Sequence, residues 1–248
     1  MAVDFNNSIG CWIHDPNTAI GKLHELQAVG FDYALVKTSD GIHAYHPDET
    51  RQLAKDAATI DLPLAAWHYA RPSDVREQAA TIAANLPDGV TDLVLDAEVE
   101  WEDYAEAHGT TSANVTVNQL CGAIKAATNG KVTLHLSSFW SPRLHSSFPF
   151  AAFMSHCKSW QPQAYLEPGS TRTAAQIITA TMLEGAKLIN PKQGQSVVVT
   201  VNNTSELAIL GSHSANGWNA YVWDPDGDAA VISNKVKWTD AIKSFRGC

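Results

Sequence analysis

The feature of this sequence that most constrains its fold is an alternation of short apolar or β-branched runs with longer amphipathic stretches. The alternation continues from about residue 9 to the end of the chain, without a linker, a low-complexity segment or a shift in composition. Short strands that alternate with helices in this way are typical of parallel βαβ units. The sequence therefore predicts a parallel sheet.

Eight strands can be counted, each followed by a segment with helical features. The predicted strands are 9–13, 33–37, 63–67, 92–96, 132–136, 159–164, 196–201 and 220–223. The first helix opens near Thr18 and stops at Gly30, another opens at Ser73, and the others are predicted at 49–60, 117–128, 148–157, 174–188, 205–210 and 237–245. No glycine-rich nucleotide-binding turn follows the first strand, which argues against an open doubly wound sheet. We expect one (β/α)8 TIM-type barrel domain over residues 1–248.

Charge and composition exclude several classes of protein. A net charge of -9 and a pI near 5.5 argue against binding to nucleic acid or to an anionic membrane surface, because both need clustered Lys and Arg. The chain starts without a secretory signal pattern, and no segment approaches ~20 uninterrupted apolar residues. We expect a soluble protein with no membrane insertion. The four cysteines are scattered singly, so we expect free buried thiols and an exposed Cys248.

The strongest single signal ends the fourth predicted strand. The segment 93–98 reads LVLDAE, so an apolar strand ends in two acids, Asp96 and Glu98, that are spaced two residues apart. Period-two alternation places both on one face, where repulsion and burial would raise one pKa and leave the other acid ionised. Such a pair can protonate a leaving oxygen and stabilise a developing cation, as glycoside hydrolysis requires. Glu102, Asp103 and Glu106, which follow, are expected in a solvated loop.

In a barrel, the working site lies at the carboxyl ends of the strands. The predicted ends carry carboxylates, amides and several of the 8 tryptophans. Indole and phenol rings can stack on sugars, and amides can pair with hydroxyl and acetamido groups. The residues expected to bind substrate are His14, Asp40, Trp67, His135, Gln163, Tyr165, Trp223 and Asp224.

Four segments carry a family resemblance: 30–41 (GFDYALVKTSDG), 64–72 (LAAWHYARP), 93–98 (LVLDAE) and 137–140 (SSFW). In order and spacing they resemble the successive strand ends of glycoside hydrolase family 25, the muramidase-type lysozymes, many of them from bacteriophages. The resemblance covers roughly residues 9 to 140. It implies a TIM-barrel N-acetylmuramidase that acts on peptidoglycan or a related N-acetylated glycan, with Glu98 as general acid. Asp96 would stabilise the reacting sugar or its acetamido group.

We also expect no cofactor, and a monomer that stays in the cytoplasm until it is released or delivered to the cell wall. The chain departs from the family pattern at several strand ends. His14 stands near the place of an aspartate, Asp40 replaces a glutamate, and Trp67 and His135 replace tyrosines. Asp224 is taken as the family's late aspartate.

These departures keep two rival hypotheses open. The first is a non-catalytic barrel that binds cell-wall glycan or serves as a structural part of a phage or tail-like assembly. The second is a metal-dependent barrel hydrolase, with His14, His68, His135 and Asp96 as candidate ligands. The histidines come singly and the first strand lacks an HxH pair, which argues against metal catalysis. A two-histidine phosphodiesterase is disfavoured because no basic cluster is present to hold phosphate.

Overall fold

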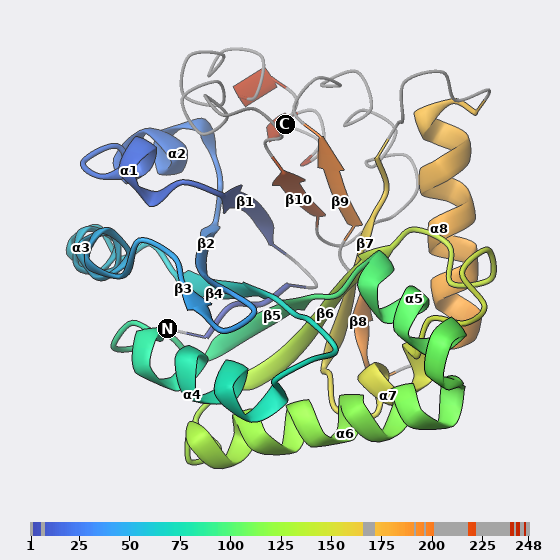
Figure 1. Cartoon of the computed structure of the whole chain (residues 1–248). Coiled ribbons are helices and arrows are strands. Elements are labelled where there is room, and N and C mark those ends of the chain that lie inside the picture. Colours follow the sequence, from blue (N-terminus) through green and yellow to red (C-terminus); the bar gives the residue numbers. More distant parts are fainter. Residues whose placement is uncertain are drawn as a thin grey trace.

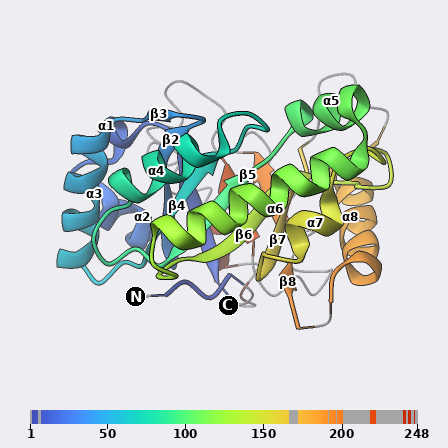
Figure 2. The ribbon, with the colours of Figure 1, turned by 60° about the horizontal axis from the view of Figure 1, so that its bottom comes forward.

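Eight parallel strands form a closed ring in the computed structural model of the chain, with the helices outside them (Figures 1 and 2). The structure describes residues 2–5, 8–165, 172–190, 192–195, 197–200, 218–221, 239–240, 242–243 and 246. Around the ring the strands are β1 (Ile9–Ile13), β2 (Tyr33–Asp40), β4 (Leu64–Tyr69), β5 (Asp92–Asp96), β6 (Thr133–Phe139), β7 (Ser159–Gln163), β9 (Val197–Thr200) and β10 (Trp218–Tyr221). β10 pairs with β1, so the ring is closed. The predicted (β/α)8 barrel is confirmed.

Two short strands lie outside this ring. β3 (His43–Ala44) turns back antiparallel to the end of β2, and β8 (Gly194–Gln195) pairs with the start of β7. The bounds of β1 and β5 agree with the sequence prediction, whereas β2 runs three residues further than predicted, to Asp40. The predicted helices 205–210 and, for the most part, 237–245 lie outside the described residues.

The helices on the outer side of the strands are α1 (Pro16–Ala19), α2 (Leu23–Val29), α3 (Pro47–Thr59), α4 (Val75–Asn85), α5 (Val99–His108), α6 (Thr110–Ala127), α7 (Phe150–Met154) and α8 (Ala174–Leu188). The single helix predicted from Thr18 to Gly30 is divided into α1 and α2. Its end is as predicted, since Gly30 caps α2 with a φ of 112°, in the left-handed region that favours glycine. No helix in the described residues is both long and apolar enough to cross a membrane.

Helix α5 corrects the sequence analysis, which placed Glu102, Asp103 and Glu106 in a solvated loop. The acids lie on a helix because Trp101 and Ala105, four residues apart, form its buried face. The indole of Trp101 donates a hydrogen bond of 2.8 Å to the carbonyl oxygen of Ala70, which fixes the start of α5 beside the end of β4.

Strand side chains alternate between two separate hydrophobic clusters, one inside the ring and one between the ring and the helices. In β2, for example, Tyr33 and Leu35 belong to the inner cluster, and Ala34 and Val36 to the outer one. Cys11, Cys121 and Cys157 are buried free thiols, as predicted, and Cys248 lies outside the described residues.

The amino-terminal end of the barrel is filled by the segment that precedes β1. The ring of Phe5 lies 4.4 Å from that of His135 and 5.2 Å from that of Tyr33. His135 is buried and contacts Asp92 at 3.2 Å and Ser159 at 2.7 Å. Asp92 and Ser159 are the first residues of β5 and β7, so this layer lies at the end of the barrel opposite the predicted site.

If Phe5 closes this end of the barrel, Phe5→Ala should lower the free energy of unfolding by about 3 kcal/mol, because it removes a ring that is 3% exposed. Urea denaturation measures the loss. Leu144→Ala is the matched control, since Leu144 is 53% exposed and its truncation should cost less than about 0.5 kcal/mol. Equal losses in the two variants would contradict this packing.

Candidate active site

The predicted acid pair shares one amide group at the carboxyl end of the barrel. Asp96 ends β5, Glu98 immediately precedes α5, and Gln163 ends β7. The side-chain nitrogen of Gln163 donates to Asp96 Oδ1 at 2.7 Å and to Glu98 Oε1 at 2.8 Å, and it lies 3.2 Å from Ser137 Oγ. Because both carboxylate bonds start at the same nitrogen, the two carboxylate oxygens are at most 5.5 Å apart.

Burial raises the affinity of this pair for a proton. Asp96 is 6% exposed, and burial together with the charge of Glu98 raises its pKa well above the usual range. Burial also raises the pKa of the half-buried Glu98, and the neighbouring Glu100 adds to the effect. Two carboxylates this close share a proton to higher pH than an isolated carboxyl group would.

A buried lysine lies beside the pair. The side chain of Lys37 in β2 is 8% exposed, and its Nζ lies 3.2 Å from Asp40 Oδ2. The same nitrogen lies 4.8 Å from the ring centre of Tyr45 and 5.0 Å from that of Trp67, distances typical of cation–π contacts. Its charge opposes the rise in the pKa of both acids. Sequence analysis assigned Lys37 no role, although a lysine within an apolar strand was a signal that could have marked it.

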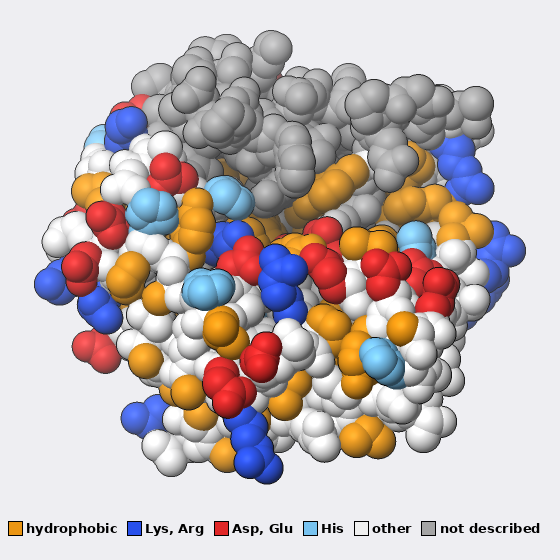
Figure 3. Space-filling model, in the orientation of Figure 1, with side chains coloured by type: hydrophobic (Ala, Val, Ile, Leu, Met, Phe, Trp, Pro, Cys, Tyr) orange, Lys and Arg blue, Asp and Glu red, His pale blue; other side chains and the backbone are white. Residues whose placement is uncertain are grey.

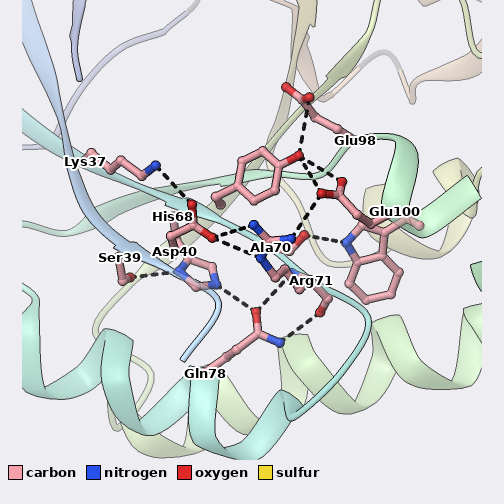
Figure 4. Close-up of polar contacts among 11 residues, drawn as sticks. Lys37, Ser39, Asp40, His68, Ala70, Arg71, Gln78, Glu98 and Glu100 are labelled. Atoms are coloured by element: carbon pink, nitrogen blue, oxygen red, sulfur yellow. Dashed lines mark hydrogen bonds and ion pairs between the residues drawn. The ribbon is translucent and has the colours of Figure 1, made fainter. Parts of the chain in front are cut away.

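Arg71 connects the carboxylates along the rim (Figure 4). Its guanidinium pairs with Asp40 at 3.0 Å and with Glu100 at 3.2 Å, and it lies 4.9 Å from the ring centre of Tyr69. The hydroxyl of Tyr69 contacts Glu100 at 2.8 and 3.0 Å and Glu98 at 3.5 Å. Burial and these carboxylates raise the pKa of Tyr69. Acidic side chains also extend in a row across the middle of the face in Figure 3, with basic side chains among them.

A buried histidine supports the segment that carries Arg71. His68 contacts Ser39 Oγ at 2.8 Å and Gln78 Oε1 at 3.1 Å, as Figure 4 shows. The same Gln78 oxygen accepts the backbone N–H of Arg71 at 3.0 Å. Burial lowers the pKa of His68 to about 4, so the ring is neutral in the folded protein near neutral pH.

The other predicted residues are placed differently. Trp67 is 2% exposed, and its indole donates to the carbonyl oxygen of Ile13 at 3.1 Å. It therefore lies beneath the open carboxyl end of the barrel, which we call the mouth, and forms its floor. His14 lies at the end of β1, 3.4 Å from the hydroxyl of Tyr45, and burial lowers its pKa. Tyr165 is half-buried and packs against the inner cluster.

The structure does not bring His135 to this site, because it lies in the amino-terminal layer with Phe5 and Asp92. Trp223 and Asp224 lie outside the described residues. Within the described part of the chain, no three His, Cys, Asp or Glu side chains are grouped so that they could hold a metal ion. The described residues therefore supply no ligand set for the metal-dependent hypothesis.

Neither a protein-family model nor a curated protein sequence matches this chain. Among solved structures, the glycoside hydrolase domain of PgaB (BpsB) from Bordetella bronchiseptica is 8% identical at a TM-score of 0.65, covering 94% of this chain and 98% of that chain. Histamine dehydrogenase from Rhizobium sp. 4-9 is 9% identical at a TM-score of 0.63, covering 99% of this chain and 50% of that chain. The fold is a (β/α)8 barrel. At these identities the likeness shows the fold alone, and enzymes of different chemistry share it.

A family 25 glycosyl hydrolase from Bacillus anthracis is similar over 65% of this chain and 72% of that chain, at 13% identity and a TM-score of 0.48. A similarity this weak carries no argument about family membership. The resemblance to glycoside hydrolase family 25 therefore remains a prediction.

The buried His68 predicts a specific loss of stability in acid. Its pKa is about 4 in the folded protein and about 6.5 when unfolded, so as pH falls between these values only the unfolded chain takes up the proton. From about pH 7 to pH 4.5, the free energy of unfolding should fall by about 2 kcal/mol more in the wild type than in His68→Leu. Urea denaturation at the two pH values measures the difference, and the exposed His24→Gln serves as control. Identical losses in the wild type and in His68→Leu would refute the assignment.

Proposed function

We propose that this protein is a glycoside hydrolase that cleaves the glycan strands of peptidoglycan, as an N-acetylmuramidase does. The observation that carries the proposal is the pair of Asp96 and Glu98 at the carboxyl end of the barrel, whose pKa values are raised and whose Gln163-bound oxygens are at most 5.5 Å apart. The fold, shared with a solved glycoside hydrolase domain, is compatible with this chemistry. The peptidoglycan substrate rests on the resemblance to family 25.

The two acids differ in burial, and this difference suggests their roles. Glu98 is half-buried and accessible from the rim, so it is the general acid that donates a proton to the glycosidic oxygen. Asp96 lies deeper and is held by Gln163, so it stabilises the positive charge that develops on the sugar or orients its acetamido group. Lys37 lowers the pKa of both acids, so it favours a pair in which one carboxyl group is ionised while the other keeps the proton.

The remaining rim residues are proposed to hold the glycan. Gln163, Asp40 and His14 offer polar atoms at three strand ends, and Tyr165 offers a half-buried ring at a fourth position. Trp67 would contribute as a floor under the sugar rather than as an exposed stacking surface, since its ring is almost fully buried. Trp223 and Asp224 keep their proposed substrate contacts from the sequence analysis.

Glu98→Gln should reduce the release of reducing ends from purified peptidoglycan by about 10²- to 10⁴-fold, because it removes the donated proton. Binding to sedimented cell walls should be retained. In the wild type, activity should disappear as pH rises through the raised pKa of Glu98. Glu106→Gln is the matched control, since it removes an exposed carboxylate of α5 that contacts Ser147. A wild-type protein that binds cell walls but never releases reducing ends would instead support the non-catalytic barrel.

The two acid oxygens that Gln163 contacts are at most 5.5 Å apart, which favours retention of configuration at the anomeric carbon. An inverting enzyme needs its carboxyl groups about 6.5 to 9.5 Å apart to admit a water molecule, and retaining pairs lie about 5 to 5.5 Å apart. Attack by Asp96, or by an acetamido oxygen that Asp96 orients, gives the same stereochemical result. Proton NMR of the first products from soluble peptidoglycan fragments identifies the anomer. An inverted first product would exclude both routes.

A further inference from the structure

Tyr69 has one hydroxyl proton and three carboxylate oxygens within reach. Its oxygen lies 2.8 and 3.0 Å from the two oxygens of Glu100, and 3.5 Å from the nearest oxygen of Glu98. A hydroxyl group can donate its proton fully to one acceptor at a time, and the shorter contacts are the stronger ones. The hydroxyl proton is therefore directed mainly to Glu100, and Glu98 keeps only the long contact of 3.5 Å.

Arg71 keeps Glu100 in this position. The guanidinium pairs with Glu100 at 3.2 Å on one side and with Asp40 at 3.0 Å on the other. The backbone of Arg71 is itself fixed by Gln78, which accepts from its N–H at 3.0 Å and donates to its carbonyl oxygen at 2.9 Å. Glu100 is thus held by Arg71, and the backbone of Arg71 is itself fixed by its hydrogen bonds to Gln78.

We propose that Glu100 is a positioning residue that withholds the Tyr69 hydroxyl proton from Glu98, so that Glu98 meets the substrate in its neutral, protonated form. The proposal rests on the proposed function, because it assigns control over the protonation of the same general acid. Glu100 itself need not touch the substrate.

The physical basis is that a hydrogen bond donated to a carboxylate stabilises its charged form. Among the described residues that face Glu98, Gln163 from β7, Lys37 from β2 and, through its long contact of 3.5 Å, Tyr69 from β4 favour the ionised form. Asp96 of β5 and Glu100 of α5 oppose it by their charge. A full hydrogen bond from Tyr69, shorter than this contact, would stabilise the ionised form of Glu98 further. By accepting the shorter bonds, Glu100 weakens the contact of Tyr69 with the Glu98 carboxylate, and its own charge adds repulsion.

The test measures the titration of Glu98 directly. Glutamate labelled with ¹³C at the side-chain carboxyl group gives a pH titration by NMR, and Glu98→Gln identifies the resonance. In Glu100→Gln, the amide oxygen can face Arg71, which leaves the NH₂ group toward the Tyr69 oxygen and frees the hydroxyl proton for Glu98. The apparent pKa of Glu98 should then fall by about one unit. In Tyr69→Phe, which has no proton to redirect, Glu100→Gln should lower it by less than half as much.

Glu102→Gln is the matched control, because it removes another carboxylate of α5 that is paired with His145 and has no contact with Tyr69. It should leave the titration of Glu98 unchanged. An equal shift from Glu100→Gln in the wild-type and Tyr69→Phe backgrounds would overturn the proposal, since the effect would then be direct repulsion. No shift in Glu100→Gln, or the same shift in Glu102→Gln, would also overturn it.

The same variants separate this inference from the proposed function. If the enzyme is active, the high-pH limit of its activity should move to lower pH in Glu100→Gln by the same amount as the titration of Glu98. If the wild type hydrolyses no glycan, the proposed function fails. The NMR titration still shows whether Glu100 controls the proton of Tyr69.

Discussion

The site depends on one constraint: charges that lie in the mouth of a closed barrel must be neutralised or hydrogen-bonded there. Asp96 and Lys37 are almost fully buried, and burial of an unpaired charge is costly. Gln163 satisfies both acids of the pair through one nitrogen, and Asp40 partners both Lys37 and Arg71. Because Gln163 comes from β7 and its acceptors from β5 and the residues after it, these contacts join strands on either side of β6. The hydrogen bonds that satisfy the buried acids therefore depend on the curvature of the sheet, which brings the ends of β5 and β7 together.

The two ends of the barrel interior have different chemistry. At the amino-terminal end, Phe5 packs against His135, which contacts Asp92 at 3.2 Å. Burial lowers the pKa of His135, and the bonds to His135 and Val3 lower that of Asp92. At the carboxyl end, Asp96 and Glu98 instead have raised pKa values. The same physical effect of burial thus produces a fixed packing layer at one end and a proton-holding site at the other, and the difference comes from the donors that each acid contacts.

Much of this arrangement could be predicted from the sequence. The segment 92–96 has the apolar pattern of a buried strand, and the two-residue spacing of Asp96 and Glu98 places both at the mouth. His135 was wrongly expected at the carboxyl end of its strand, because that strand was predicted to end at residue 136. Since β6 runs to Phe139, residue 135 lies near its start. The shared amide of Gln163 could not be foreseen either, since it depends on closure of the ring. Helix α5 was missed because its apolar residues do not form one clear stripe between its acids, and only Trp101 and Ala105 are buried.

The irregular pairing of β2 has a consequence for the charge of the mouth. Residues three apart in a regular strand face opposite sides of the sheet, yet Lys37 and Asp40 form an ion pair. The register between β2 and β4 shifts between Lys37 and Ser39, so Thr38 is an extra residue. Ser39 can therefore face outward to His68, while the lysine and the aspartate both face the mouth. A regular strand of the same composition would turn one of these two charges toward the helices, so a single inserted residue decides whether the barrel mouth contains a cation beside its acids.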